Sequence, residues 1–127
     1  ALRKKDGALI VKDNTIIADG YNGTPSGFEN DCEVATYHPD GSFQGYQTKW
    51  YVLHAESNAL AKVAKSTQSC DGATLYVTYS PCTECSKLIL QSGIKKVVYL
   101  EEYRDVSGLD FLRRAGIELK KIEINND

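Results

Sequence analysis

The alternation of apolar and polar residues along the chain predicts an α/β protein built from short elements. The apolar segment 7–11, the turn Lys12-Asp13-Asn14 and the β-branched segment 15–18 together predict an antiparallel hairpin. Residues 28–48 are mostly polar, with Pro39-Asp40-Gly41 as a turn, and we expect them to be irregular. An irregular stretch of that length is unusual in a compact domain and is typically functional.

From residue 54 onward the pattern changes to alternating helices and strands. The expected elements are a helix at 54–65, a strand at 74–79, a helix from Pro81 to Gly93 with Ser80 as its N-cap, a strand at 96–100, a helix at 107–115 and an edge strand at 118–124. Strands that are joined through helices run parallel to one another. We therefore expect a mixed five-stranded sheet with helices on both faces, in a single domain over residues 1–127.

Composition narrows the class of partner. The net charge of −2 over 127 residues is the opposite of the basic surplus with which proteins bind nucleic acid polymers. No apolar run approaches the roughly 20 residues of a membrane span, and no signal peptide begins the chain, so we expect a cytoplasmic protein that binds a small ligand. The sequence contains no methionine, so we expect residues to be missing at its start.

Three residues have the spacing of a catalytic metal site. Cys82 and Cys85 lie three apart at the start of a predicted helix, which places both sulfurs on one helix face, where the helix N-terminus favours thiolates. His54, at the start of another helix, supplies an imidazole nitrogen. Three protein ligands leave the fourth tetrahedral position of a zinc ion open for water, and the ion lowers the pKa of that water to about 7.

Glu56 lies two residues from His54 and is not needed for coordination. The order His-x-Glu, then Pro-Cys-x-x-Cys, is the signature of zinc-dependent deaminases. We expect Glu56 to take a proton from the zinc-bound water, to pass that proton to the ring nitrogen N3, and later to protonate the departing amine. The backbone N–H of Ala55 is expected to donate to the pyrimidine O2.

Other interpretations of these residues stay open. A Cys-x-x-Cys pair by itself is also found in redox sites and in structural zinc sites. A non-catalytic zinc module would need a fourth ligand, such as Cys32, His38 or Cys70, and would have no carboxylate beside the metal. Cys70 precedes a strand and is expected to be a small buried apolar residue.

Four segments resemble the deoxycytidylate (dCMP) deaminases, above all those of bacteria and phages. They are residues 20–27, 54–59, 79–85 and 91–96. The resemblance implies a three-layer cytidine deaminase-like fold and hydrolysis of dCMP to dUMP, which supplies thymidylate synthesis. It assigns His54, Cys82 and Cys85 to zinc and Glu56 to proton transfer.

The same resemblance implies further contacts and regulation. Asn22 would bind the sugar 3′-hydroxyl, and Tyr103 and Arg104 would close over the nucleotide, the ring stacking on the base and the guanidinium binding phosphate. The segment formed by Gly20, Tyr21, Asn22 and Gly23 would take part in activation by dCTP with Mg²⁺ and in inhibition by dTTP. A hexamer of identical subunits is also implied.

The sequence departs from the family in two places. This sequence starts after the helix that usually precedes the first strand, so we expect that helix to be missing from it. Asp31 stands where some phage relatives have a cysteine for a second, structural zinc, although Cys32 is adjacent. The competing enzymes are other zinc deaminases that act on tRNA adenosine, nucleosides or free bases. The tRNA enzymes need a basic groove and usually lack Gly-Tyr-Asn-Gly, and the near-neutral charge also disfavours them.

Overall fold

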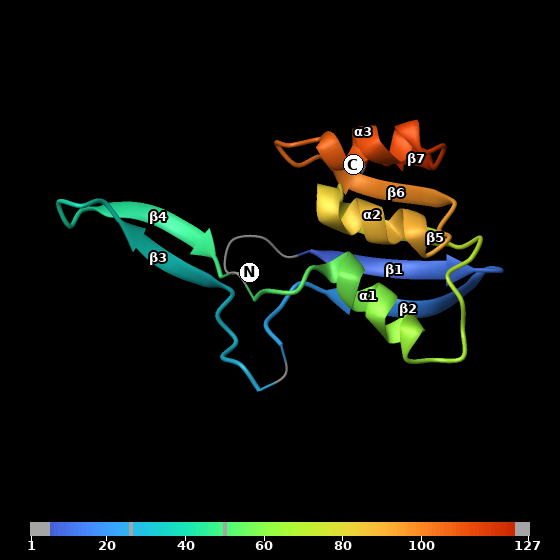
Figure 1. The fold of residues 1–127 in the computed structure, drawn as a ribbon, viewed down its shortest axis with the longest axis horizontal. Coiled ribbons are helices and arrows are strands. Elements are labelled where there is room, and N and C mark those ends of the chain that lie inside the picture. The colour runs from blue at the N-terminus through green and yellow to red at the C-terminus, as the bar shows by residue number, and fades with distance from the viewer. Residues whose placement is uncertain (1–5, 26, 50, 124–127) are drawn as a thin grey trace.

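The computed structural model describes residues 6–25, 27–49 and 51–123 (Figure 1). The main sheet consists of β1 (Gly7–Lys12), β2 (Thr15–Tyr21), β5 (Thr74–Tyr79), β6 (Lys96–Glu101) and β7 (Glu118–Lys121), in the order β2-β1-β5-β6-β7. β1 is antiparallel to β2 and β5, whereas β5, β6 and β7 are parallel. The predicted mixed five-stranded sheet is confirmed, with β7 as an edge strand. This strand ends at Lys121, earlier than the predicted range 118–124, of which residue 124 lies outside the described residues.

The β1–β2 hairpin forms where the sequence predicts it. Asp13 and Asn14 both have positive φ angles, 52° and 61°. Asp and Asn are the side chains that adopt this left-handed conformation most readily, and two such residues make the tight turn that matches the twist of a hairpin.

Three helices accompany the sheet in the described part of the chain: α1 (Ala55–Ala64), α2 (Thr83–Gln91) and α3 (Ser107–Arg114). Their buried residues, among them Ala59, Ile89 and Leu112, share one apolar core with Leu75 and Val97 of the sheet. All three helices therefore pack on one face, although the sequence predicts helices on both. None of them is long and apolar enough to span a membrane.

The opposite face of the sheet is more open. Leu9 and Tyr76, which alternate with core residues along β1 and β5, are 39% and 40% exposed. Within the described residues, no helix packs on this face.

The region predicted to be irregular contains a second hairpin, so that prediction is wrong. β3 (Glu33–Tyr37) pairs with β4 (Phe43–Thr48) and projects from the body of the molecule (Figure 1). Neither strand has a buried face, and Tyr37, Phe43 and Tyr46 are about half or more exposed. The alternation of apolar and polar residues that identifies a strand comes from burial of one face, so these strands lack it.

The start of α2 also differs from the sequence prediction. Cys82, not Ser80, is the N-cap, and its Sγ accepts a hydrogen bond from the Cys85 N–H at 3.4 Å. Ser80 is fully buried, and its Oγ accepts the Tyr103 N–H at 3.0 Å. A thiolate can replace the usual hydroxyl cap because the N-terminal N–H groups attract negative charge.

Gly20 lets α1 lie directly against β2. A Cβ atom at this position would lie 2.3 Å from the Ala55 carbonyl oxygen and 2.7 Å from the Ala59 nitrogen. We expect Gly20→Ala to lower the free energy of unfolding by about 2–3 kcal/mol, since helix backbone has to move. Urea unfolding checks this result, with Gly23→Ala as the control, because a Cβ there meets nothing within 4 Å. Equal stabilities would contradict the packing argument.

Candidate active site

Two helix N-termini bring the three predicted ligands together. His54 is the N-cap of α1 and Cys82 the N-cap of α2, while Cys85 lies in the first turn of α2. His54 Nδ1 is 3.5 Å from Cys82 Sγ and 3.4 Å from Cys85 Sγ. The ligand atoms of all three residues lie within 4.8 Å of one another.

This geometry fits a zinc ion. Zn–S and Zn–N bonds of about 2.3 and 2.0 Å at a tetrahedral angle separate nitrogen from sulfur by about 3.5 Å, close to the observed spacing. One imidazole and two sulfurs are donors that suit zinc. Within the described residues the group has no fourth His, Cys, Asp or Glu ligand. The set therefore has the composition of an open, catalytic zinc site and not that of a closed structural one.

The remaining cysteines lie outside this group. Cys70 is 6% exposed and belongs to the apolar core, as the sequence predicts. Cys32 is buried and His38 exposed at the projecting hairpin, and neither joins a cluster of metal ligands among the described residues.

The ligands share protons in the metal-free protein. Hydrogen bonding from the Cys85 thiol, and then from His54, lowers the pKa of Cys82 to about 4, so that Cys82 is a thiolate at neutral pH. The same contact with Cys82, together with burial, raises the pKa of Cys85, and the hydrogen bond to Cys82 raises the pKa of His54. Binding of a metal ion therefore displaces a proton from Cys85.

Glu56 lies in the first turn of α1, beside the ligands, with only 2% of its surface exposed. Its Oε1 atom is buried and has no hydrogen-bond partner among the described residues. A buried carboxyl oxygen without a partner is costly, and active sites are where such groups are found. Burial, above all, raises the pKa of Glu56 to about 7, which suits a group that gains and loses a proton at neutral pH.

The raised pKa of Glu56 predicts how the stability of the metal-free protein depends on pH. The folded protein keeps a proton that the unfolded chain releases above 4.5, so stability falls as the pH rises from 4.5 to about 7. The loss is roughly 3 kcal/mol. Glu56→Gln removes this pH-dependent contribution. Between pH 4.5 and about 7, the free energy of unfolding of the variant should therefore rise by roughly 3 kcal/mol relative to that of the wild type. Urea unfolding of the reduced, metal-free proteins checks it; a difference that is constant with pH would contradict the assignment.

The loop after β2 is fastened to the start of α1. Gly23 and Leu53 exchange two backbone hydrogen bonds, of 3.0 and 2.7 Å, directly before His54. Asn58 Nδ2 donates to the Tyr21 carbonyl oxygen at 2.6 Å. The Gly-Tyr-Asn-Gly segment therefore lies next to the ligand set.

Ala55 is the first residue of α1 and is fully buried. His54, the N-cap, makes no side-chain hydrogen bond to the helix, so the cap does not occupy the N–H groups of this first turn. Such N–H groups are natural donors to a ligand oxygen.

Tyr103 and Arg104 lie in the loop between β6 and α3. The Tyr103 ring stacks on Tyr79, with the centroids 5.2 Å apart. Burial raises the pKa of Tyr103, and the nearby negative charges of Asp6 and Glu56 add to that shift. Arg104 is exposed. Of this pair, Tyr103 is the one whose backbone N–H is bonded to Ser80, two residues before the ligand Cys82.

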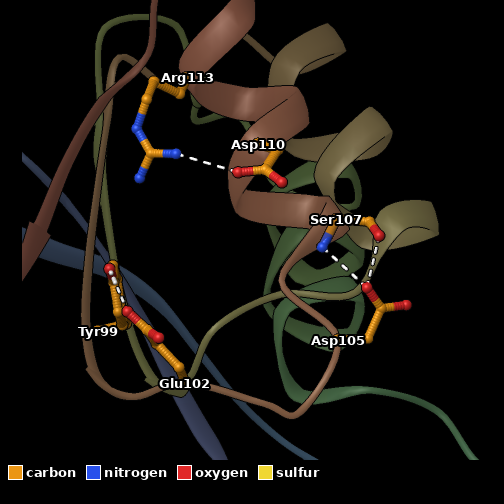
Figure 2. A network of polar contacts seen from close by, with 6 residues as sticks. All are labelled: Tyr99, Glu102, Asp105, Ser107, Asp110 and Arg113. Atoms are coloured by element: carbon orange, nitrogen blue, oxygen red, sulfur yellow. Dashed lines mark hydrogen bonds and ion pairs between the residues drawn. The ribbon is translucent and has the colours of Figure 1, made fainter.

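Hydrogen bonds at both ends hold this loop in place (Figure 2). The Tyr99 hydroxyl donates to Glu102 Oε1 at 3.4 Å at one end. At the other end, the N–H of Ser107, the first residue of α3, donates to Asp105 Oδ1 at 2.9 Å. The residues between these anchors include Tyr103 and Arg104.

Asp6 is a site residue that the sequence reasoning missed. It precedes β1, is 6% exposed, and lies close enough to His54 and Glu56 for their charges to interact. The available signal was an acidic residue immediately before an apolar strand, at a position that the sheet buries.

Comparison with known proteins agrees with this geometry. Residues 3–101 match the family described as "Cytidine and deoxycytidylate deaminase zinc-binding region". The deoxycytidylate deaminase of Enterobacteria phage T4 is 38% identical over 156 residues, covering 96% of this chain and 81% of the relative. That of Mycobacterium phage D29 is 41% identical over 106 residues, covering 79% and 80%. The crystal structure of the dCMP deaminase from cyanophage S-TIM5 in complex with dCMP and dUMP has a TM-score of 0.82 and 51% identity, covering 94% of this chain and 82% of that one. The chain therefore belongs to the deoxycytidylate deaminases of the cytidine and deoxycytidylate deaminase zinc-binding family.

Proposed function

We propose that the chain hydrolyses dCMP to dUMP and ammonia. The observation that carries this proposal is a buried carboxylate, Glu56, with an unpartnered oxygen beside an open His-Cys-Cys ligand set. The S-TIM5 enzyme, 51% identical, was crystallised with dCMP and dUMP, which supports the same substrate and product for this chain.

The proposed roles follow from the chemistry of the clustered side chains. His54, Cys82 and Cys85 hold the zinc ion, which when bound activates water for attack on the pyrimidine ring. Glu56 accepts a proton from the attacking water and donates it to ring nitrogen N3. It next carries a proton to the exocyclic amine, which leaves as ammonia when its bond to C4 breaks. Because the water oxygen replaces that amine, the ring of dCMP becomes that of dUMP.

The remaining contacts bind and orient the nucleotide. We assign Asn22 to the sugar 3′-hydroxyl, the Ala55 N–H to the pyrimidine O2 and the Tyr103 ring to the base. The position of the first two beside His54, and of Tyr103 beside Glu56, supports these roles. Arg104 is assigned to the phosphate, which an exposed guanidinium on the same loop can reach from solvent when the nucleotide binds.

A substrate panel tests the proposal. Purified zinc-loaded protein is assayed with dCMP, cytidine, dCTP, cytosine and an anticodon stem-loop RNA, and ammonia release is measured. We expect dCMP to have the highest kcat/KM. Turnover of the RNA alone would overturn the proposed function, and zinc binding without turnover of any substrate would favour a non-catalytic module.

Four broader properties are proposed with it, of which the hexamer and the regulation are implied by the family resemblance. They are a single deaminase domain over residues 1–127, a hexamer of identical subunits, residence in the cytoplasm where dUMP feeds thymidylate synthesis, and regulation through residues 20–23 by dCTP with Mg²⁺ and by dTTP. One apolar core shared by all three helices supports the first. Light scattering tests the second, and assays of dCMP turnover with added dCTP and Mg²⁺ or dTTP test the last.

A further inference from the structure

Asp6 is a buried acidic residue that the proposed reaction does not use. It directly precedes β1, at the end of the sheet where β2 and β5 finish, and only 6% of its surface is exposed. Burial raises the pKa of this carboxyl, whereas the hydrogen bonds that it accepts and the charge of His54 lower it. A residue so costly to bury is expected where function requires it.

The backbone of Asp6 fixes the side chain of Asn22. The Asp6 N–H donates to Asn22 Oδ1 at 3.1 Å, and the Asn22 N–H donates to the Asp6 carbonyl oxygen at 3.2 Å. These reciprocal bonds fasten the start of β1 to the end of β2. They also orient the carboxamide of Asn22, because its oxygen has to face β1.

The carboxylate of Asp6 lies beside both stacked tyrosines. Its Oδ1 accepts the Tyr79 N–H at 3.4 Å, and the carboxylate interacts electrostatically with Tyr103. The Tyr103 ring lies against Tyr79 at an interplanar angle of 21°. Tyr103 is thereby held by Ser80 at its N–H and by Tyr79 at its ring, in a position where its hydroxyl can donate to Asp6.

Asp6 therefore connects two residues that come from distant parts of the chain. We infer that Asp6 is a positioning residue, which holds Asn22 and Tyr103 where they bind the nucleotide. This inference rests on the proposed function, because Asn22 and Tyr103 are its nucleotide-binding residues. A carboxylate suits the task because its two oxygens can accept a backbone N–H and a hydroxyl at once. The backbone of Asp6 meanwhile binds Asn22.

The test separates positioning from simple structural support. Asp6→Ala removes the acceptor for Tyr103, so we expect KM for dCMP to rise about 10-fold or more, with kcat changed by less than about 3-fold, because binding contacts are lost equally in ground and transition states. Asp6→Asn keeps an acceptor oxygen and should restore KM to within about 3-fold of the wild type. Asp110→Asn, an exposed residue paired with Arg113 on α3, is the matched control and should leave KM unchanged.

A double variant identifies the residue through which Asp6 acts. Tyr103→Phe keeps the ring and removes the hydroxyl. If Asp6 acts through that hydroxyl, the KM of the double variant should be close to that of Asp6→Ala alone and not the product of the two separate increases. Effects that multiply, or an Asp6→Ala enzyme with a lower melting temperature and unchanged KM, would overturn the inference. If Asp6→Ala does not fold, Tyr103→Phe still decides, because an unchanged KM there contradicts the role of the hydrogen bond. A wild-type enzyme inactive on dCMP would instead overturn the proposed function.

Discussion

Glu56→Gln is expected to reduce kcat for dCMP by at least about 1,000-fold while the protein keeps its full zinc content. The amide has nearly the same shape as the carboxyl but cannot accept and return a proton at neutral pH. Glu56 is not one of the three clustered ligands, so its replacement leaves the metal donors intact. Steady-state assays combined with metal analysis of the same preparation check both halves of the prediction.

The matched control is Glu84→Gln. Glu84 is a neighbouring acidic residue in the first turn of α2, but it is exposed and its carboxylate pairs with Lys87 at 3.2 Å. Loss of such a surface pair changes little, so kcat should stay within about 2-fold of the wild type. Loss of zinc from Glu56→Gln would show that Glu56 is a ligand, and retained turnover would show that another group moves the proton.

The ligand set could be predicted from the sequence because its geometry is local. Two cysteines three apart at a helix start share a face whatever the rest of the fold does, and His54 and Glu56 are fixed relative to each other by one helix turn. What the sequence could not give is the distance between the two helix starts, which depends on the packing of α1 and α2 on one sheet.

The features that sequence reasoning missed depend on contacts between distant segments. Asp6 acquires its role from Asn22 and Tyr79, which lie 16 and 73 residues away along the chain. Local rules predict Ser80 as a helix cap. In the structure Ser80 is buried after β5, and its hydroxyl oxygen accepts the Tyr103 N–H instead. The β3–β4 hairpin was missed for the opposite reason, since neither of its strands has a buried face and the sequence therefore shows no burial pattern.

Cys85→Ser is expected to lose most of its zinc and at least about 1,000-fold of its turnover. Cys85 Sγ is 3.4 Å from His54 Nδ1, the residue is 4% exposed, and the cluster contains no further His, Cys, Asp or Glu of the described residues to replace it. A serine hydroxyl stays protonated at neutral pH and is a much weaker ligand for zinc than a thiolate. Two ligands then hold the ion too weakly to survive dialysis against a chelator.

Cys70→Ser separates this effect from the general cost of placing a hydroxyl in a buried position. Cys70 is similarly buried, at 6%, but lies in the apolar core away from the ligand set. Its replacement should lower the free energy of unfolding by about 1–3 kcal/mol and leave one zinc per folded chain and wild-type turnover. Metal analysis, urea unfolding and dCMP turnover on both variants give the comparison. Zinc retained in Cys85→Ser would show that Cys85 is not a ligand. Zinc lost equally from both variants would show that the loss comes from a hydroxyl in a buried position and not from the missing ligand.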